Sequence, residues 1–309
     1  MTETRADAEA PPRLLARRLL SGKVGVVLLP AHQSVEAQRL APEVAAYLAA
    51  RGVRVLRETD GTSQLGLVIS LGGDGLMMRA ARRYPDVPIL GINFGHFGFL
   101  TAAEAGEWQP AIQRVLEGDF QVRVGPTLSS RLVPAAGAGA TGPVEDLGWA
   151  VNDVVVHGGL RFVQPALFID RQYVNDYPGD GMVIATPTGS TAYCMAAGGP
   201  VLLTGAAGFA IVPISCHSPI RVSLVVPEDV ELAIRLEGRH PANLIIDGES
   251  EKLRALEPGD TVFVKKGPVA FRQISFRSFD WFSAFQSKFN YQIRRAGRIP
   301  ALPNVEEAS

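Results

Sequence analysis

The chain has 309 residues, a formal net charge of −1 and a pI of about 6.5. Proteins dedicated to nucleic-acid binding usually carry a high pI or a basic patch, so we expect no nucleic-acid partner. The only two cysteines, Cys194 and Cys216, provide no disulfide framework and favour a reducing, cytoplasmic location. A chain of this length can bury a sizeable core and is expected to form two domains.

The first part of the chain alternates predicted strands and helices. Residues 1–22 are expected to form an N-terminal tail, because the start is polar and contains no apolar signal-peptide core. Hydrophobic periodicity then predicts strands over residues 24–29, 53–56, 67–71 and 87–93, and helices over residues 34–50, 76–84 and 103–116. This order predicts a Rossmann-like α/β domain over residues 23–120, with a mostly parallel sheet whose ligand crevice lies at the carboxyl ends of the strands.

The pattern changes after residue 120. Short apolar runs between Gly and Pro turns predict strands over residues 121–124, 130–133, 147–156, 166–169, 182–186, 222–226, 232–236, 244–246 and 261–265. They indicate a β-rich second domain over residues 121–275, followed by a helix over residues 276–295 and a loose tail over residues 297–309. The longest apolar stretch, residues 201–214, is too short to cross a membrane, so we expect no membrane association.

A glycine-rich acidic turn closes the apolar run 65–71, with the sequence Ser70-Leu71-Gly72-Gly73-Asp74-Gly75. Glycines let the backbone approach a ligand closely, and the acid between them can act as a base. Because a helix is predicted to begin here, we expect Gly72, Gly73, Gly75 and Arg79 to bind phosphate. The alternative is an ordinary turn in which Asp74 only caps the helix.

A hydroxyl-rich loop, Thr186 to Tyr193, follows a predicted buried strand. It lies in a stretch, residues 181–220, that contains no Asp, Glu, Lys or Arg. A strand that enters a Gly/Ser/Thr turn and opens a short helix can aim backbone N–H groups at an anion. The loop is therefore predicted to line a crevice that holds a phosphorylated ligand.

One apparent motif is rejected. Gly137-Ala138-Gly139-Ala140-Thr141-Gly142 matches the G-x-G-x-x-G pattern, but prolines flank it and it opens no predicted helix. A dinucleotide-binding loop needs a strand before it and a helix after it, so we predict a hairpin loop. A Walker A sequence is absent, which argues against an ordinary P-loop kinase.

Taken together and in order, the acidic turn, residues 91–100 (GINFGHFGFL), Asn152-Asp153, the loop preceded by Asp180, and residues 196–200 (AAGGP) resemble the NAD kinase family, bacterial type. The resemblance extends from about residue 23 to residue 281. It implies transfer of the γ-phosphoryl of ATP to the 2′-hydroxyl of the adenosine ribose of NAD, with Asp74 as general base. It also implies Mg²⁺ or another divalent cation carried by ATP, a homodimer or homotetramer, and packing of residues 276–296 against the first domain.

The resemblance also implies a set of NAD-binding residues. Asn152 and Asp153 would hold a ribose, Asp180 would contact the nicotinamide half, and Tyr193 would stack on the adenine. The full NAD set is Asp74, Gly75, Asn152, Asp153, Arg161, Pro178, Asp180, Thr191, Ala192, Tyr193, Cys194, Met195, Ala196 and Glu249. In this family the acid before the loop reaches a neighbouring subunit's site, which would make Asp180 a shared residue. The histidines His96, His157 and His217 lack metal-site spacing and are interpreted as structural, so we predict no protein metal site.

The sequence departs from the family pattern at four positions. Leu76 replaces a common Thr, Pro178 replaces an Arg found in many bacterial members, Asp153 replaces a Glu, and Ala196 replaces a Ser. Two alternatives stay open: another kinase of the diacylglycerol kinase and phosphofructokinase-like superfamily, and a non-catalytic protein that senses NAD. The resemblance leaves open whether NADH is accepted and whether polyphosphate replaces ATP.

Overall fold

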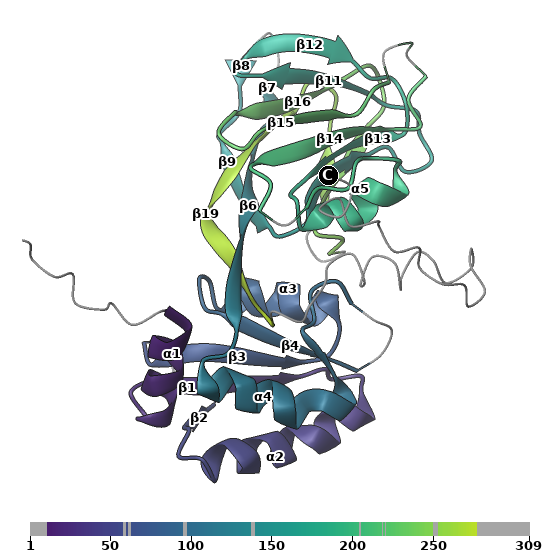
Figure 1. Ribbon diagram of the computed structural model, residues 1–309. Helices are drawn as coiled ribbons and strands as arrows, with labels where there is room; N and C mark the ends of the chain where they lie inside the picture. The colour runs from purple at the N-terminus through teal and green to yellow at the C-terminus, as the bar shows by residue number, and fades with distance from the viewer. Residues whose placement is uncertain are drawn as a thin grey trace, which may run out of the picture.

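The computed structural model describes residues 11–57, 60, 63–94, 98–136, 140–203, 205–217, 219, 221–249 and 253–276. These residues form two lobes, an α/β lobe at the bottom of Figure 1 and a β lobe at the top, joined by two long strands. The predicted fold class, an α/β domain with a mostly parallel sheet followed by a β-rich domain, is confirmed.

The N-terminal lobe is built on parallel strands in the order β2-β1-β3-β4, with β5 also parallel to β4. Its elements are β1 (Gly25–Pro30), α2 (Val35–Ala49), β2 (Val55–Leu56), β3 (Leu65–Leu71), α3 (Asp74–Arg83), β4 (Ile89–Asn93), β5 (Ala103–Glu104), the 3₁₀ turn η1 (Ala105–Glu107) and α4 (Trp108–Glu117). The central strands are apolar throughout because helices cover both faces of the sheet. α2 and α4 pack on one face and α3 packs on the other.

Part of the predicted N-terminal tail is helical instead. Residues 11–20 form α1 (Pro11–Leu20), which packs against α4 and β3. Ala16 and Leu19 are buried on the same face of this helix. The tail prediction was wrong here because proline is tolerated in the first turn of a helix, so Pro11-Pro12 begins α1 rather than preventing it.

The C-terminal lobe contains a six-stranded sheet in the order β15-β14-β13-β10-β17-β18. Its strands are β10 (Asp153–His157), β13 (Gly181–Ala185), β14 (Gly208–Ile214), β15 (Leu224–Pro227), β17 (Ala242–Ile246) and β18 (Arg254–Leu256). Val154 and Val156 of β10 face the main core of the lobe, whereas Val155 faces the opposite side with Cys194. This alternation matters because Asp153 and His157 share the side of Val155.

The other sheet of the C-terminal lobe continues into the N-terminal lobe. It contains β6 (Gln121–Val133), β9 (Glu145–Ala150), β11 (Gln164–Ile169), β12 (Gln172–Asp176), β16 (Leu232–Glu237) and β19 (Thr261–Ser275). The first part of β19 pairs with β16, and Gln273 near its end pairs with Ile89 of β4. One hydrogen-bonded sheet therefore runs through both lobes, along the two long strands visible in Figure 1.

The long strands were predicted only as fragments. The predicted strands 121–124 and 261–265 end before Pro126 and Gly267-Pro268, whereas β6 and β19 continue through these residues with a register irregularity between Lys266 and Ala270. A β-bulge tolerates proline because the local backbone N–H groups need no ladder partner. The sequence analysis also missed β12 and β14, and it joined β9 and β10 into one strand.

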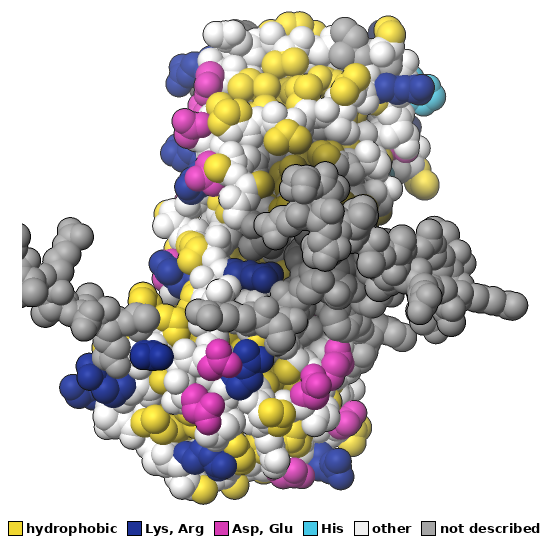
Figure 2. All heavy atoms as spheres, viewed as in Figure 1, with side chains coloured by type: hydrophobic (Ala, Val, Ile, Leu, Met, Phe, Trp, Pro, Cys, Tyr) yellow, Lys and Arg dark blue, Asp and Glu magenta, His cyan; other side chains and the backbone are white. Residues whose placement is uncertain are grey.

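Three further expectations can be placed against the described residues. The rejected glycine motif overlaps β8 (Ala140–Thr141), which pairs antiparallel with β7 (Ala135–Ala136) as expected for a hairpin, and residues 137–139 lie outside the described residues. The helix expected at 276–295 and the tail at 297–309 lie outside the described residues, apart from Phe276, which is buried in the N-terminal core. No helix within the described part of the chain is long and apolar enough to cross a membrane. On the face drawn in Figure 2, basic side chains are interspersed with acidic ones.

Candidate active site

Asp74 is the first residue of α3, and Gly73 occupies the N-cap position. The Asp74 carboxylate makes no capping bond and instead accepts hydrogen bonds from the backbone N–H groups of Phe99 (2.9 Å) and Leu100 (3.0 Å). The interpretation of Asp74 as a helix cap is therefore wrong. Each carboxylate oxygen holds one donor and keeps lone-pair capacity for a further partner, so the group is fixed in direction without being saturated.

Gly98 makes this arrangement possible. A Cβ atom built on Gly98 would lie 2.1 Å from Oδ1 of Asp74. Any side chain at position 98 would therefore displace the carboxylate or the backbone that holds it. Gly98 lies in the GINFGHFGFL segment noted in the sequence, but nothing in the sequence connected it with Asp74.

The glycines around Asp74 divide into two kinds. Gly72 is buried, its N–H donates to the carbonyl of Ile92 (2.9 Å), and a Cβ there would meet Leu76 at 2.9 Å. Gly72 is thus a packing position, and its N–H is not available to the phosphate for which it was predicted. Gly73 and Gly75 are exposed with open space around them, at the end of α3 where N–H groups lack intrahelical partners. Arg79 is exposed on the same helix.

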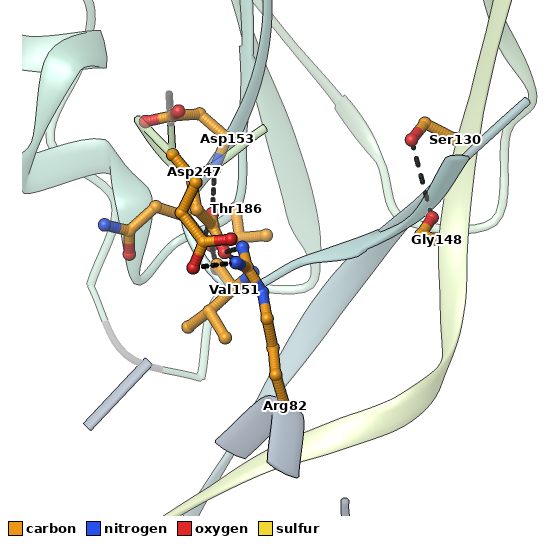
Figure 3. Close-up of polar contacts among 9 residues, drawn as sticks. Arg82, Ser130, Gly148, Val151, Asp153, Thr186 and Asp247 are labelled. Atoms are coloured by element: carbon orange, nitrogen blue, oxygen red, sulfur yellow. Dashed lines mark hydrogen bonds and ion pairs between the residues drawn. The ribbon is translucent and has the colours of Figure 1, made fainter. Parts of the chain in front are cut away.

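The Asn152-Asp153 turn, between β9 and β10, is organised by Asp247. The Asp247 carboxylate accepts hydrogen bonds from the backbone N–H groups of Val151 (2.8 Å), Asn152 (2.6 Å) and Asp153 (3.0 Å). Asp247 also forms an ion pair with Arg82 of α3 (Figure 3). Its own backbone is left-handed, with φ 51°. The sequence analysis did not identify Asp247 as a site residue.

A pocket of about 500 Å³ opens beside this turn. Its lining consists of Asn152, Asp153, Val155, His157, Ala192, Tyr193, Ile245, Asp247 and Gly248. Burial, reinforced by the charge of Asp247, raises the pKa of Asp153 from 3.8 to about 7. Near neutral pH this carboxyl group therefore exists in both protonation states and can donate or accept a hydrogen bond.

His157, the last residue of β10, also lines the pocket. Its Nδ1 accepts a hydrogen bond from the N–H of Gly159 at 2.8 Å, which leaves the proton of the neutral ring on Nε2. The sequence analysis interpreted His157 as structural only. The signal that could have identified it is the two-residue spacing from Asp153 through Val155, which places all three side chains on one face of the strand.

The hydroxyl-rich loop is locked from inside. Thr186 donates to the carbonyl of Val151 (2.6 Å) and accepts from the N–H of Gly189 (3.0 Å). Ser190 donates to Pro187 (2.7 Å) and accepts from the N–H of Leu202 (2.9 Å). A Cβ on Gly189 would lie 2.0 Å from the carbonyl oxygen of Asn152, so the loop rests directly on the Asn152-Asp153 turn. The hydroxyls of Thr186 and Ser190 therefore support the site and do not cradle an anion.

The residues after the loop separate into lining and packing positions. Ala192 and Tyr193 line the pocket, and Tyr193 is 36% exposed. Burial raises the pKa of the Tyr193 hydroxyl, and the charges of Asp153 and Asp180 add to it. Cys194 is fully buried, and burial together with the charge of Asp153 raises its pKa to about 11, which marks it as a packing residue. Thr191 and Met195 are half-buried, and Ala196 is exposed.

Four other predicted residues are not part of the described lining of this pocket: Arg161, Pro178, Asp180 and Glu249. The backbone of Asp180 is held between Ile214 and Gly158 by hydrogen bonds of 2.9 and 2.8 Å. Arg161 is exposed in the turn after β10, and the carbonyl of Pro178 accepts from the N–H of His217. Glu249 forms an ion pair with Arg82, so its direct contact with NAD stays a prediction.

Comparison with known proteins was decisive for classification. The model for the ATP-NAD kinase N-terminal domain matches residues 31–120, and that for the ATP-NAD kinase C-terminal domain matches residues 151–276. The chain belongs to the ATP-NAD kinase family. An NAD kinase of Thermomicrobium roseum is 46% identical over 89% of this chain and 93% of its own length. An NAD kinase of Gemmatimonas aurantiaca is 34% identical over 72% of this chain and 74% of its own length.

Solved structures of ATP-NAD kinase relatives share the fold. Yeast NADH kinase in complex with NADH aligns with a TM-score of 0.77 and 19% identity, covering 89% of this chain and 90% of that one. An NAD kinase from Archaeoglobus fulgidus in complex with ATP aligns with a TM-score of 0.66 and 22% identity, covering 86% and 97%. These likenesses confirm that the two-lobed architecture is the one used by this family of enzymes.

Proposed function

We propose that this protein transfers the γ-phosphoryl group of ATP to the 2′-hydroxyl of the adenosine ribose of NAD, producing NADP. The observation that carries the proposal is the Asp74 carboxylate, held by two backbone N–H groups and left with free lone pairs. Membership of the ATP-NAD kinase family supplies the substrate class. The relatives with high identity carry the name NAD kinase.

In the proposed reaction, Asp74 accepts the proton of the ribose hydroxyl as its oxygen attacks the γ-phosphorus. The new oxygen–phosphorus bond forms while the bond to the bridging oxygen of ATP breaks, and ADP leaves. A positioned carboxylate can contribute about 10²–10⁴-fold to such a step. The open N–H groups at Gly73 and Gly75 would contact the phosphates, with Arg79 as a nearby cation.

NAD would lie across the pocket of the C-terminal lobe. Asn152 and Asp153 would bind its adenosine ribose, and the partly exposed ring of Tyr193 would stack on the adenine. Asp180, whose charge reaches Tyr193, would contact the nicotinamide half. The Asn152 Oδ1 atom is buried and has no hydrogen-bond partner among the described residues, which suits an acceptor reserved for a ligand hydroxyl.

We propose Mg²⁺, or another divalent cation, as a partner that enters with ATP. Within the described residues no three His, Cys, Asp or Glu side chains cluster in a way that could hold a metal ion. The described residues therefore fit a cation that is held mainly by the phosphates of ATP and would neutralise their charge. The residues of this chain would bind and orient the loaded nucleotide.

The test is an assay of purified protein with NAD, ATP and Mg²⁺, coupled to a dehydrogenase specific for NADP. Parallel reactions omit ATP, replace NAD with NADH, or use the Asp74→Asn variant. NADP formation that requires both ATP and Asp74 supports the proposal. Phosphorylation of diacylglycerol or fructose 6-phosphate without NADP formation would assign another kinase activity, and NAD binding without turnover would indicate a sensor.

A further inference from the structure

Arg82 joins the two halves of the candidate site. It lies near the end of α3 in the N-terminal lobe, and its side chain is only 12% exposed. Its guanidinium forms ion pairs with Asp247 and Glu249, which follow β17 in the C-terminal lobe. Figure 3 shows the Arg82 side chain extending from its helix to the Asp247 carboxylate.

Within the described part of the chain, Arg82 is the one cation that contacts the Asp247 carboxylate, and the Asp247 side chain is fully buried. It accepts hydrogen bonds from the backbone N–H groups of Val151, Asn152 and Asp153 and thereby shapes the Asn152-Asp153 turn, which is proposed to bind the ribose. A buried carboxylate of this kind is costly unless it is both hydrogen-bonded and paired with a positive charge. Arg82 supplies that charge.

The same helix carries Asp74. α3 is a single ten-residue helix, with Asp74 as its first residue and Arg82 next to its last. At the rise of an α-helix, these positions lie about 12 Å apart along the axis. A rigid element of that length thus has the proposed base at one end and the support of the ribose-binding turn at the other.

We propose that Arg82 is a positioning residue: through Asp247 it holds the Asn152-Asp153 turn in the shape that binds NAD and ties this turn to the helix that carries Asp74. The inference rests on the proposed function for the identity of the ligand. Arg82 is not among the residues that line the pocket, so its effect on NAD would pass through Asp247, which does line it.

The lobes do not depend on Arg82 for their connection. The β6–β19 ladder continues from one lobe to the other, and Val151 and Phe271 are buried in the N-terminal core. A variant that lacks the guanidinium is therefore expected to keep its fold. The variant lacks the positive charge beside Asp247. The Asp247 carboxylate would then bind water or a proton, and its hydrogen bonds from the amides of residues 151–153 would weaken.

The experiment compares Arg82→Met with Arg83→Met. Arg83 is the exposed neighbour on α3, and its guanidinium lies beside the ring of Tyr84. Hydrogen exchange of backbone amides is followed by mass spectrometry in peptides that contain residues 151–153. We expect exchange there to be about tenfold faster in Arg82→Met, because the coupling between Arg82 and the turn is of modest strength. Exchange should be unchanged in Arg83→Met.

The second readout is kinetic. In Arg82→Met, the KM and the directly measured Kd for NAD should each rise about tenfold, whereas the KM for ATP should hardly change. Arg82→Lys should recover part of the NAD affinity, because an ammonium restores the charge but cannot reach two carboxylates with a planar fork. A merely structural role would lower the melting temperature of all variants without this separation of the two KM values.

A double-mutant cycle completes the test. If Arg82 acts through Asp247, the loss of NAD affinity in Arg82→Met/Asp247→Asn should be smaller than the product of the two single losses. If the loss of NAD affinity in the double variant equals the product of the two single losses, the inference is overturned. Exchange at residues 151–153 that remains at the wild-type rate would also overturn it. The exchange measurement needs no NAD, so it tests Arg82 even if the wild-type protein makes no NADP and the proposed function fails.

Discussion

The two lobes build their parts of the site in opposite ways. In the N-terminal lobe the key carboxylate, Asp74, is held by two amides of another segment, and the flanking Gly73 and Gly75 are open to solvent. In the C-terminal lobe the polar groups of Thr186, Ser190 and Asp247 are buried and hydrogen-bonded to backbone groups. Glycines occur at both places, yet the first turn leaves backbone donors open and the second is closed by internal hydrogen bonds.

This difference suggests a division of labour. An exposed turn with unsaturated groups can contact a reacting phosphate, whereas an internally bonded turn can hold a binding surface in a fixed shape. Changes at Asp74 and at the residues that hold its carboxylate should therefore act mainly on kcat. Changes in the C-terminal part should act mainly on NAD binding and on stability.

The largest expected effect is that of Asp74→Asn. The amide keeps the shape of the side chain but cannot accept the proton of a ribose hydroxyl, so kcat should fall about 10²–10⁴-fold. The amide nitrogen cannot accept a hydrogen bond, so one of the two bonds from Phe99 and Leu100 is lost and the free energy of unfolding should fall by about 1 kcal/mol. Steady-state kinetics and chemical denaturation measure the two quantities, and a near-normal kcat would exclude Asp74 as the base.

Asp153→Asn should change the pH dependence of stability. Because folding raises the pKa of Asp153 from 3.8 to about 7, its stabilising protonated form is fully present below 3.8 and is lost as the pH rises through 7. The variant lacks this loss, so above pH 7 it should be more stable than wild type by about 4 kcal/mol.

Chemical denaturation at several pH values checks this expectation. Asp229→Asn serves as the control, since Asp229 is an exposed carboxylate in the same lobe. A wild-type protein whose stability does not fall between pH 4 and pH 8 relative to Asp153→Asn would show that Asp153 is ionised at little cost.

Gly98→Ala sharpens the comparison from the N-terminal side. The added methyl group would collide with Oδ1 of Asp74, and a misplacement of about 1 Å can reduce kcat about 10²-fold. Gly106→Ala is the matched control, because a Cβ atom there meets nothing within 4 Å. Equal kcat values for the two variants would mean that the Phe99 and Leu100 amides do not position the base.

Asn152→Ala tests the binding side. Loss of the side-chain amide should raise the KM for NAD about tenfold and leave the KM for ATP nearly unchanged, since the amide is assigned to ribose recognition. The measurement varies each substrate while the other is saturating. A larger change in the KM for ATP would reverse the assignment of the two sites.

The smallest expected signal comes from mixed oligomers. We expect a homo-oligomer in which Asp180 serves a neighbouring subunit, so co-expressed Asp74→Asn and Asp180→Ala chains should form mixed dimers with one intact site. Random pairing would restore about a quarter of the wild-type activity. If the mixed dimers stay inactive, Asp180 acts within its own chain, where its charge already reaches Tyr193.

The sequence was informative wherever the signal was local. Apolar runs and the glycines at 72–75 predicted the parallel sheet and the position of Asp74, since strand, turn and helix follow one another directly. The contact of Asp74 with residues 98–100 could not be predicted, because it depends on how a distant segment folds back. The same holds for Asp247, which lies about a hundred residues after the turn that it organises.

Other errors came from residues with two meanings. The predicted strands 121–124 and 261–265 ended before Pro126 and Pro268, although tertiary pairing carries β6 and β19 past both prolines. The hydroxyl-rich loop was interpreted as an anion-binding turn, although short polar side chains also bond readily to nearby backbone. Only the packed structure decides between these uses.

The sheet that passes through both lobes has a consequence for how this protein can be divided. A fragment ending at residue 120 would leave β4 without its partner β19 and would expose that strand edge to aggregation. The boundary that separates the two halves along the chain therefore does not separate two folding units. Heating the intact protein should produce a single calorimetric transition, and neither half should be recoverable as a cooperative, self-sufficient domain.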